Sequence, residues 1–303
     1  MQSTSTILLI RPANFGFNEQ AAVTNSFMNM PTQTWPVHQQ ALEEFDNFTE
    51  CLKQNGVKVI IVDDTESPHT PDSIFPNNWF STHSDGKLFL YPMQAENRRM
   101  ERREDILEQL NKQFKITETC DLSYFESENK FLEGTGSMVL DRNNKLVYAC
   151  LSPRTNLDVL HEFCSKAGYT PITFTALGQN GKAIYHTNVM MCLGDTFAII
   201  CLESIKDNEE RKKVATSLES SGKEIITINN KQLNQFAGNM LQLKNHYENL
   251  LIMSEQAFNA LEKYQAFLLE KHCKLVHCPL DTIESVGGGS ARCMIAEIFL
   301  EPR

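Results

Sequence analysis

The sequence predicts an α/β fold in which short strands alternate with amphipathic helices, and three observations carry this prediction. Short apolar runs rich in β-branched residues alternate with stretches in which apolar residues recur at helical spacing. Several neighbouring runs are joined by turn-rich segments and are therefore expected to pair as hairpins. No Gly-x-Gly-x-x-Gly segment follows a strand candidate, so a dinucleotide-binding, doubly wound parallel sheet is disfavoured.

Two helix-to-strand units are clearest. In the first, apolar residues recur at helical spacing from Leu42 to Leu52, and Gly56 stands where a helix C-terminus favours left-handed backbone. Val57 to Val62 is then predicted as a buried strand. In the second unit, a helix carrying Phe258 to Leu268 is followed by a strand from Lys274 to Cys278.

Further strands are expected from the other short apolar runs. They are Ile7 to Ile10, Leu88 to Tyr91, Met138 to Leu140, Leu146 to Cys150, Val189 to Cys192, Phe197 to Cys201, Ile225 to Ile228, Met240 to Leu243 and Leu250 to Met253. Two neighbouring pairs flank the turn-rich segments Asp141 to Asn144 and Gly194-Asp195, so these pairs are predicted to be hairpins. No linker divides the chain, so one domain over residues 1–303 is expected.

Composition narrows the possible functions. Lys plus Arg is 28 against 38 for Asp plus Glu, giving a net charge of −10, which argues against a nucleic-acid partner. No apolar run approaches the roughly 20 residues of a membrane span. The segment Met1 to Thr6 is polar and uncharged, without the basic region of a secretory leader. We therefore expect a cytoplasmic protein without a membrane contact.

The nine cysteines are expected to be reduced, because no Cys-x-x-Cys spacing indicates a disulfide framework. Only Cys293 follows a glycine-rich segment, beginning at Gly287, whose backbone can approach a ligand closely, and the adjacent Arg292 would favour a thiolate. The spacing of histidines and cysteines predicts no zinc or iron site. The remaining cysteines are expected in the core: Cys51, Cys120, Cys150, Cys164, Cys192, Cys201, Cys273 and Cys278.

Three further segments place polar groups in unusual surroundings: Asp72-Ser-Ile-Phe-Pro-Asn-Asn-Trp79, Phe131-Leu-Glu-Gly-Thr-Gly136 and Tyr185-His-Thr-Asn188. Each has an ordinary structural explanation when taken singly, such as a turn or a hydrogen-bonded histidine at the start of a strand. Together with Cys293 they supply a thiol, an imidazole and a carboxylate, which is the minimum set for nucleophilic catalysis by an activated cysteine.

In this order the motifs resemble the guanidino-group-modifying, or pentein, superfamily, which includes arginine deiminase, dimethylargininase and the amidinotransferases. The resemblance runs from Arg11 to Cys293, and the chain looks most like the bacterial citrulline-utilization hydrolases. It implies a five-bladed α/β propeller of pseudo-repeats of about 60 residues and a metal-free, cofactor-free hydrolase. The motifs are Asp72-x-x-Phe75-x-x-Asn78, Glu133-Gly134-x-Gly136, Leu151-Ser-x-Arg154-Thr-Asn156, His186-x-Asn188 and Cys293.

The resemblance also implies roles for individual residues. Cys293 resembles the family nucleophile, His186 its general acid and base, and Glu133 the carboxylate that orients the site. A histidine titrating near neutrality suits both proton transfers. Arg154 and Arg99 resemble the pair that holds the substrate α-carboxylate, for which an arginine fork is well shaped.

The substrate expected from this resemblance is a small ureido or guanidino amino acid. The residues that match Asn78 and Asn188 are aspartates in arginine deiminases, and two neutral amides suit an uncharged ureido group better than a guanidinium. This favours hydrolysis of citrulline to ornithine, ammonia and carbon dioxide. Asp72 remains as a possible guanidinium partner, and a succinylarginine-hydrolysing branch also has asparagine near this place.

Three alternatives therefore stay open. The protein could be a deiminase or dihydrolase of arginine or a methylarginine, or an amidinotransferase in which an amine replaces water. It could also be a catalytically silent propeller that serves as a binding scaffold.

Overall fold

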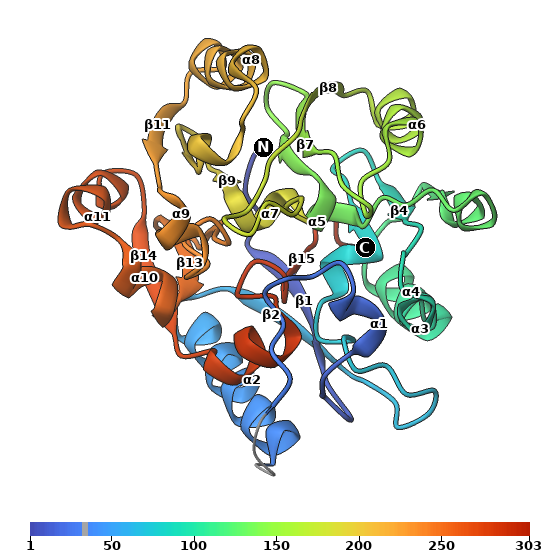
Figure 1. Ribbon diagram of the computed structural model, residues 1–303. Coiled ribbons are helices and arrows are strands. Elements are labelled where there is room, and N and C mark those ends of the chain that lie inside the picture. Colours follow the sequence, from blue (N-terminus) through green and yellow to red (C-terminus); the bar gives the residue numbers. More distant parts are fainter. Residues whose placement is uncertain (32–35) are drawn as a thin grey trace.

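The computed structural model describes residues 1–31 and 36–303, and its strands form five three-stranded sheets arranged in a ring (Figure 1). Each sheet has the same plan, in which the central strand is antiparallel to one neighbour and parallel to the other. The strand orders are β15-β1-β2, β3-β4-β5, β6-β7-β8, β9-β10-β11 and β12-β13-β14. The five-bladed α/β propeller is confirmed.

The strands are β1 (Thr6–Arg11), β2 (Lys58–Asp63), β3 (Phe80–Thr82), β4 (Lys87–Leu90), β5 (Glu118–Asp121), β6 (Val139–Asp141), β7 (Leu146–Cys150), β8 (Thr170–Phe174), β9 (Met191–Leu193), β10 (Phe197–Ile200), β11 (Glu224–Thr227), β12 (Leu241–Lys244), β13 (Asn249–Ser254), β14 (Lys274–Cys278) and β15 (Ala296–Glu297). The helices are α1 (Glu19–Ala22), α2 (Val37–Gln54), α3 (Glu96–Arg99), α4 (Glu104–Gln113), α5 (Gly134–Ser137), α6 (Leu157–Ala167), α7 (Thr187–Met190), α8 (Asn208–Ser220), α9 (Asn230–Leu233), α10 (Glu255–Ala260) and α11 (Lys263–Glu270). Short helical turns are η1 (Pro76–Asn78), η2 (Ser123–Glu128), η3 (Leu202–Ser204) and η4 (Ile283–Gly287).

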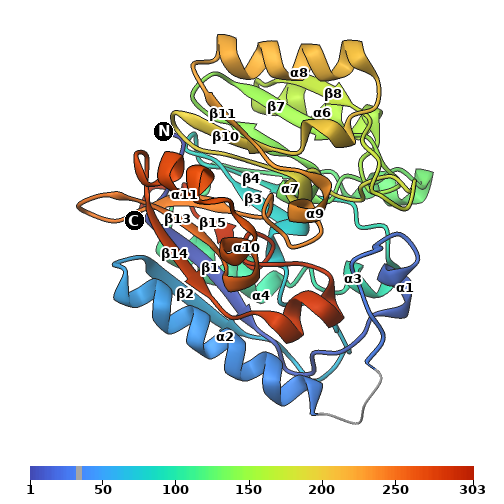
Figure 2. The ribbon, with the colours of Figure 1, turned by 60° about the vertical axis from the view of Figure 1, so that its left-hand side comes forward.

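The helices on the outside of the ring connect each central strand to its parallel partner. They are α2, α4, α6, α8 and the pair α10 and α11 (Figures 1 and 2). A parallel pair needs such a crossover, whereas the antiparallel neighbour is reached by a hairpin. The first blade is completed by β15 from the C-terminal end, with Ile7 opposite Glu297 and Leu8 opposite Ala296. The two ends of the chain therefore close the ring in one sheet.

Helix α2 shows how an outer helix is held. Its residues Phe45 and Phe48 are fully buried and belong to one apolar cluster with Ile7 and Leu9 of β1. The opposite face of α2 carries exposed acidic and amide side chains, among them Glu43 and Gln54. Burying the apolar face against its own sheet is what stabilises such a helix, because helical propensity alone contributes little.

The sequence predictions are confirmed for both helix-to-strand units and both hairpins, with two corrections. The strand expected at Val189 to Cys192 begins only at Met191, because the preceding residues form the single helical turn α7. The helix expected across residues 258–268 is interrupted, since Leu261 is extended and Glu262 begins a new helix with a capping box. Strands β3, β5, β8 and β15 were not expected, because they are short and only partly apolar.

The innermost strand of each blade, β3, β6, β9, β12 or β15, contributes to the centre of the ring. Contacts between blades join β6 to β9, β9 to β12 and β15 to β3. A tight turn precedes each of these strands and lies near the axis: η1, α5, α7, the segment 234–240 and the segment 287–294. Within the part of the chain that the structure describes, no helix is long and apolar enough to span a bilayer.

Candidate active site

The five turns before the inner strands bring one polar side chain each toward the axis. These are Asn78, Glu133, His186, Asn239 and Cys293, and none is more than 3% exposed. They are distant in sequence, and each lies two to six residues before the inner strand of its blade. The propeller therefore assembles a buried polar cluster out of five local turns.

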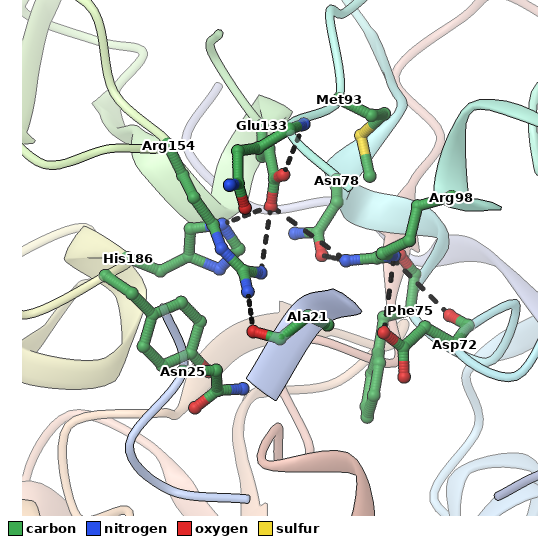
Figure 3. Close-up of polar contacts among 12 residues, drawn as sticks. Ala21, Asn25, Asp72, Phe75, Asn78, Met93, Arg98, Glu133, Arg154 and His186 are labelled. Atoms are coloured by element: carbon green, nitrogen blue, oxygen red, sulfur yellow. Dashed lines mark hydrogen bonds and ion pairs between the residues drawn. The ribbon is translucent and has the colours of Figure 1, made fainter. Parts of the chain in front are cut away.

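Glu133 and His186 form the central pair of this cluster (Figure 3). The His186 Nε2 atom lies 2.8 Å from Glu133 Oε2, and Arg154 Nη1 donates to the same oxygen at 3.3 Å. Burial alone would raise the pKa of Glu133, but Arg154, His186 and Arg98 outweigh it and hold that pKa well below its usual range. Burial lowers the pKa of His186 to about 4, against the opposing effect of Glu133. His186 is therefore neutral at pH 7 here, not poised near neutrality as expected from the sequence.

Gly136 allows the ring of His186, with its second nitrogen, to pack closely against the turn before β6. A Cβ atom on Gly136 would lie 2.8 Å from His186 Nδ1 and 2.5 Å from Asn78 Nδ2, so no larger residue fits. With Nε2 donating to Glu133, a neutral His186 carries its unprotonated nitrogen at Nδ1. This nitrogen is the one that can accept a proton.

Cys293 receives two amide donors. Asn188 Nδ2 lies 3.3 Å and Asn239 Nδ2 lies 3.2 Å from Cys293 Sγ. The guanidinium of Arg292 donates to Ile295 O and to Glu297, so the expected influence of Arg292 on the thiol does not take the form of a hydrogen bond. The direct polar contacts of the sulfur come from neutral amides.

The arginine predicted at position 99 lies outside the cluster, and its neighbour Arg98 takes the inner place. Arg98 is 2% exposed and donates to Glu101 through Nε and Nη2, each at 2.9 Å, and to Asn78 Oδ1 at 2.9 Å. Arg99 instead donates to Met93 O and is partly exposed. Adjacent residues of a helix differ in direction by about 100°, so only one of the two can face the axis.

Arg154 connects the cluster to the N-terminal segment. It donates from Nε to Thr24 Oγ1 at 2.8 Å. It also donates from Nη2 to Ala21 O at 2.6 Å (Figure 3). Its guanidinium also lies 5.0 Å from the centre of the Tyr185 ring. The segment around α1 therefore covers the site and takes its position from a site residue.

Asp72 offers an acceptor that the surrounding protein does not use. The side chain is 2% exposed, and Asn18 Nδ2 donates to Oδ2 at 2.8 Å while Arg98 Nε lies 3.6 Å away. Among the described residues, no partner reaches Asp72 Oδ1. Burial raises the pKa of Asp72 above its usual value, and Arg98 and Asn18 offset this only in part. A buried carboxylate oxygen without a partner is costly and favours a ligand that donates to it.

One small cavity joins most of these groups. Three of the residues predicted from the sequence do not line this cavity. Glu133 contacts His186, Asn188 contacts the sulfur of Cys293, and Arg99 donates to the backbone of Met93. Tyr185 and Asn239 were not predicted. The lining residues are Asn25, Asp72, Phe75, Asn78, Arg98, Arg154, Tyr185, His186, Gly287, Gly288, Gly289 and Cys293.

Within the part of the chain that the structure describes, neither the other cysteines nor the metal-ligating side chains form a second polar cluster like this one. Cys51 is half-buried, and the other seven cysteines outside the site are buried, in agreement with their expected core positions. Within residues 1–31 and 36–303, no group of three or more His, Cys, Asp or Glu side chains is arranged to hold a metal ion.

Comparison with known proteins agrees with this geometry. Residues 11–300 match the sequence model of the family described as N,N dimethylarginine dimethylhydrolase, eukaryotic. The comparison with curated proteins found no match.

Among solved structures, the substrate-bound N-terminal domain of ArgZ, an arginine dihydrolase from the ornithine-ammonia cycle in cyanobacteria, has a TM-score of 0.76 and 17% identity, covering 98% of each chain. The chain covers 41% of the longer ArgZ protein, so it spans about two fifths of that relative. A dimethylarginine dimethylaminohydrolase adduct with S-methyl-L-thiocitrulline has a TM-score of 0.68 and 16% identity, covering 98% of this chain and all of that one. At these identities the structural likeness shows the shared fold.

The family match extends over nearly the whole chain, and the fold is that of the solved pentein structures. The chain therefore belongs to the N,N-dimethylarginine dimethylhydrolase family of the pentein superfamily, a group of guanidino-group hydrolases that act on C–N bonds other than peptide bonds.

Proposed function

We propose that the protein hydrolyses the guanidino group of a free arginine-type amino acid, arginine or an N-methylated arginine, with Cys293 as the nucleophile. The observation that carries this proposal is the unpartnered Asp72 Oδ1, which belongs to a buried carboxylate lining the same cavity as Cys293 and His186. Such an oxygen accepts N–H groups and repels a carbonyl oxygen. It therefore suits a cationic substrate.

The contacts of Asn78 weaken the earlier argument for citrulline. Its Oδ1 atom already accepts from Arg98 Nη1, which leaves only one lone pair of that oxygen for a ureido nitrogen. The comparisons likewise do not support citrulline. The matched family acts by its description on dimethylarginine, and ArgZ is an arginine dihydrolase. These relatives favour a guanidino substrate for this chain.

Arg154 and Arg98 are proposed to hold the substrate α-carboxylate. A guanidinium has five N–H groups, and three hydrogen bonds from Arg154 lead to Thr24, Glu133 and Ala21. N–H groups therefore remain for a carboxylate. Because Arg154 also fixes the N-terminal segment, substrate binding would be linked to closure of the cavity.

The proposed reaction uses a neutral His186. His186 Nδ1 accepts the thiol proton of Cys293, whose sulfur attacks the guanidino carbon and forms a C–S bond. The C–N bond then breaks, and ammonia or the methylated amine leaves with the proton that His186 returns. A water molecule then attacks the same carbon, with His186 Nδ1 accepting its proton, and the C–S bond breaks to restore Cys293. Glu133 keeps the Nε2 proton in place throughout.

The test is a substrate panel of arginine, monomethylarginine, dimethylarginine, citrulline and succinylarginine. Ammonia, methylated amines, citrulline and ornithine are measured for each, with glycine added in parallel as an amine acceptor. Release of amine from arginine or a methylarginine at least about tenfold faster than ammonia from citrulline supports the proposal. Faster turnover of citrulline or succinylarginine, transfer to glycine, or no turnover at all would each overturn it.

The variant Asp72→Asn shows which cationic end of the substrate contacts Asp72, the guanidinium or the α-ammonium. If Asp72 contacts the guanidinium, this variant loses activity toward arginine but not toward citrulline. If Asp72 contacts the α-ammonium, both substrates lose about 2 kcal/mol or more of transition-state stabilisation. Unchanged kcat/KM for both would show that Asp72 binds neither end.

A further inference from the structure

Asn239 is held in one orientation by three contacts. Its Oδ1 atom accepts from the backbone N–H of Arg292 at 3.1 Å, and its Nδ2 atom donates to Asn188 O at 2.9 Å and to Cys293 Sγ at 3.2 Å. The accepting contact at Oδ1 identifies the other amide atom as the nitrogen. The group that meets the sulfur is therefore a donor whose direction is fixed by the backbone of two other blades.

Asn188, the second donor to the sulfur, is less constrained. Its Nδ2 atom lies 3.3 Å from Cys293 Sγ, but its Oδ1 atom has no partner within the described part of the chain. That side chain can change its contacts when a substrate arrives, whereas Asn239 cannot do so without losing two backbone hydrogen bonds. The two amides therefore differ in what they can do for the reaction.

The position of Asn239 in the fold supports a role in the reaction. It precedes β12, just as Asn78 precedes β3, Asn188 precedes β9 and Cys293 precedes β15. Asn239 is fully buried, and the adjacent Gly238 packs so closely on the backbone of Val189 and Met190 that a Cβ atom there would clash. The blade β12-β13-β14 thus places a polar side chain against the sulfur of Cys293.

We propose that Asn239 is a catalytic residue whose fixed amide N–H stabilises the Cys293 thiolate that forms when the thiol proton passes to His186 Nδ1, and aims its sulfur at the substrate carbon. This inference rests on the proposed function, because it assigns the residue a part in attack by Cys293. A buried anion needs hydrogen-bond donors, and the nearby carboxylates Asp72 and Glu133 make that need greater. The amides of Asn188 and Asn239 supply two donors to the sulfur without adding a positive charge.

The same contact acts in both halves of the reaction. During attack, His186 Nδ1 accepts the thiol proton of Cys293, an electron pair of the sulfur forms the C–S bond, and the leaving amine takes that proton from His186. When water later displaces the sulfur, the C–S electron pair returns to Cys293 and the Asn239 N–H receives the developing thiolate. Asn239 therefore affects kcat more than KM.

The matched experiment uses Asn239→Asp and Gln242→Glu in the full chain. Gln242 Nε2 donates to the sulfur of the noncatalytic Cys273 at 3.2 Å and is equally buried, so both variants replace an amide donor to a cysteine by a carboxyl group. The rate of alkylation by iodoacetamide at pH 7 is followed by mass spectrometry of the peptide that contains Cys293. Circular dichroism melting curves report folding.

We expect Asn239→Asp to slow alkylation of Cys293 about 10- to 100-fold, since a hydrogen bond to a charged group is lost, while Gln242→Glu stays within about twofold of wild type. Asn239→Ala removes the donor without adding a charge and should slow alkylation about tenfold, with KM within about threefold. Wild-type alkylation rates in Asn239→Ala would overturn the proposal, as would an activity loss that follows only the melting temperature. If wild type is alkylated at Cys293 but turns over no substrate, the proposed function fails and the alkylation comparison still decides the role of Asn239.

Discussion

Replacing Glu133 with glutamine should damage stability and catalysis by separate and measurable amounts. The fully buried carboxylate contacts His186 at 2.8 Å, Arg154 at 3.3 Å and Arg98 at 3.9 Å, and its other oxygen accepts from the backbone N–H of Gln94 at 3.0 Å. Glutamine has nearly the same shape but no charge. Its carbonyl oxygen can keep the contact with Gln94, so its NH₂ group must face two arginines and the histidine.

The loss of stability follows from the uncompensated arginines. Removing one partner of a buried ion pair costs about 3 to 5 kcal/mol. With an unfolding entropy of about 2.1 cal/mol/K per residue, the 303-residue chain has about 0.6 kcal/mol/K at the melting temperature. We therefore expect Glu133→Gln to lower the melting temperature by about 5 to 8 °C.

The loss of catalysis follows from the histidine tautomer. A glutamine NH₂ group beside His186 Nε2 favours the tautomer in which Nε2 accepts and Nδ1 carries the proton. The nitrogen beside Gly136 then cannot accept a proton from thiol or water. General acid–base catalysis contributes about 100- to 10,000-fold, so kcat should fall by that order while the protein remains folded at 25 °C.

The assay measures amine release for Glu133→Gln and for a control, Glu126→Gln. Glu126 pairs with Arg102 at 2.6 Å outside the cavity, so the control also removes a carboxylate from an arginine. We expect the control to retain kcat within about threefold. If Glu133→Gln retains wild-type kcat, or if the control loses as much, the orienting role of Glu133 is refuted.

Three further outcomes are expected. Cys293→Ser should abolish turnover and leave the melting temperature within about 2 °C of wild type, and residual turnover above 1% of wild type, roughly, would exclude Cys293 as the nucleophile. Arg154→Lys keeps the charge but loses the planar fork, and should lower kcat/KM by about 1 to 3 kcal/mol, an effect that an analogue without the α-carboxylate should not show. Burial raises the pKa of Glu284 to about 7, and Ser290 Oγ donates to its carboxyl group at 2.5 Å. Because this pKa lies above the ordinary value of 4.5, the contribution of Glu284 to the free energy of unfolding is fully present below pH 4.5 and is lost as the pH rises through 7. Urea unfolding of Glu284→Gln at pH 5 and pH 8 should therefore show the variant gaining about 2.5 kcal/mol relative to wild type at the higher pH, and parallel changes in both proteins would contradict the assignment.

The local pattern of the sequence determined much of the fold. Apolar residues at helical spacing fixed α2, and its glycine terminator at Gly56 does adopt a positive φ of 81°. Turn-rich segments between apolar runs fixed the hairpins β6–β7 and β9–β10. These features depend on residues that are neighbours in the sequence. The ring of five blades was expected only because the motifs resemble those of the pentein superfamily.

Part of the site could also be predicted from the sequence. Cys293, His186 and Glu133 stand out because glycines or small residues surround them, and such residues are needed where backbones approach closely, as Gly136 does beside His186. Asn239 has a comparable setting after Gly238 and would have been found by aligning the five repeats. The sequence alone gave no reason to align segments of such different length and composition.

Other features were decided only by the tertiary structure. Helix rotation selects Arg98 over Arg99, and Arg292 turns away from the thiol toward Glu297. Arg98 donates to Asn78 Oδ1, a contact between separate segments that occupies part of an acceptor on which the choice of citrulline depended. Burial lowers the pKa of His186 to about 4, although the residue type suggests a value near neutrality. Directions of side chains, occupied hydrogen bonds and desolvation arise from atoms far away in the sequence, so they exist only once the five blades have closed.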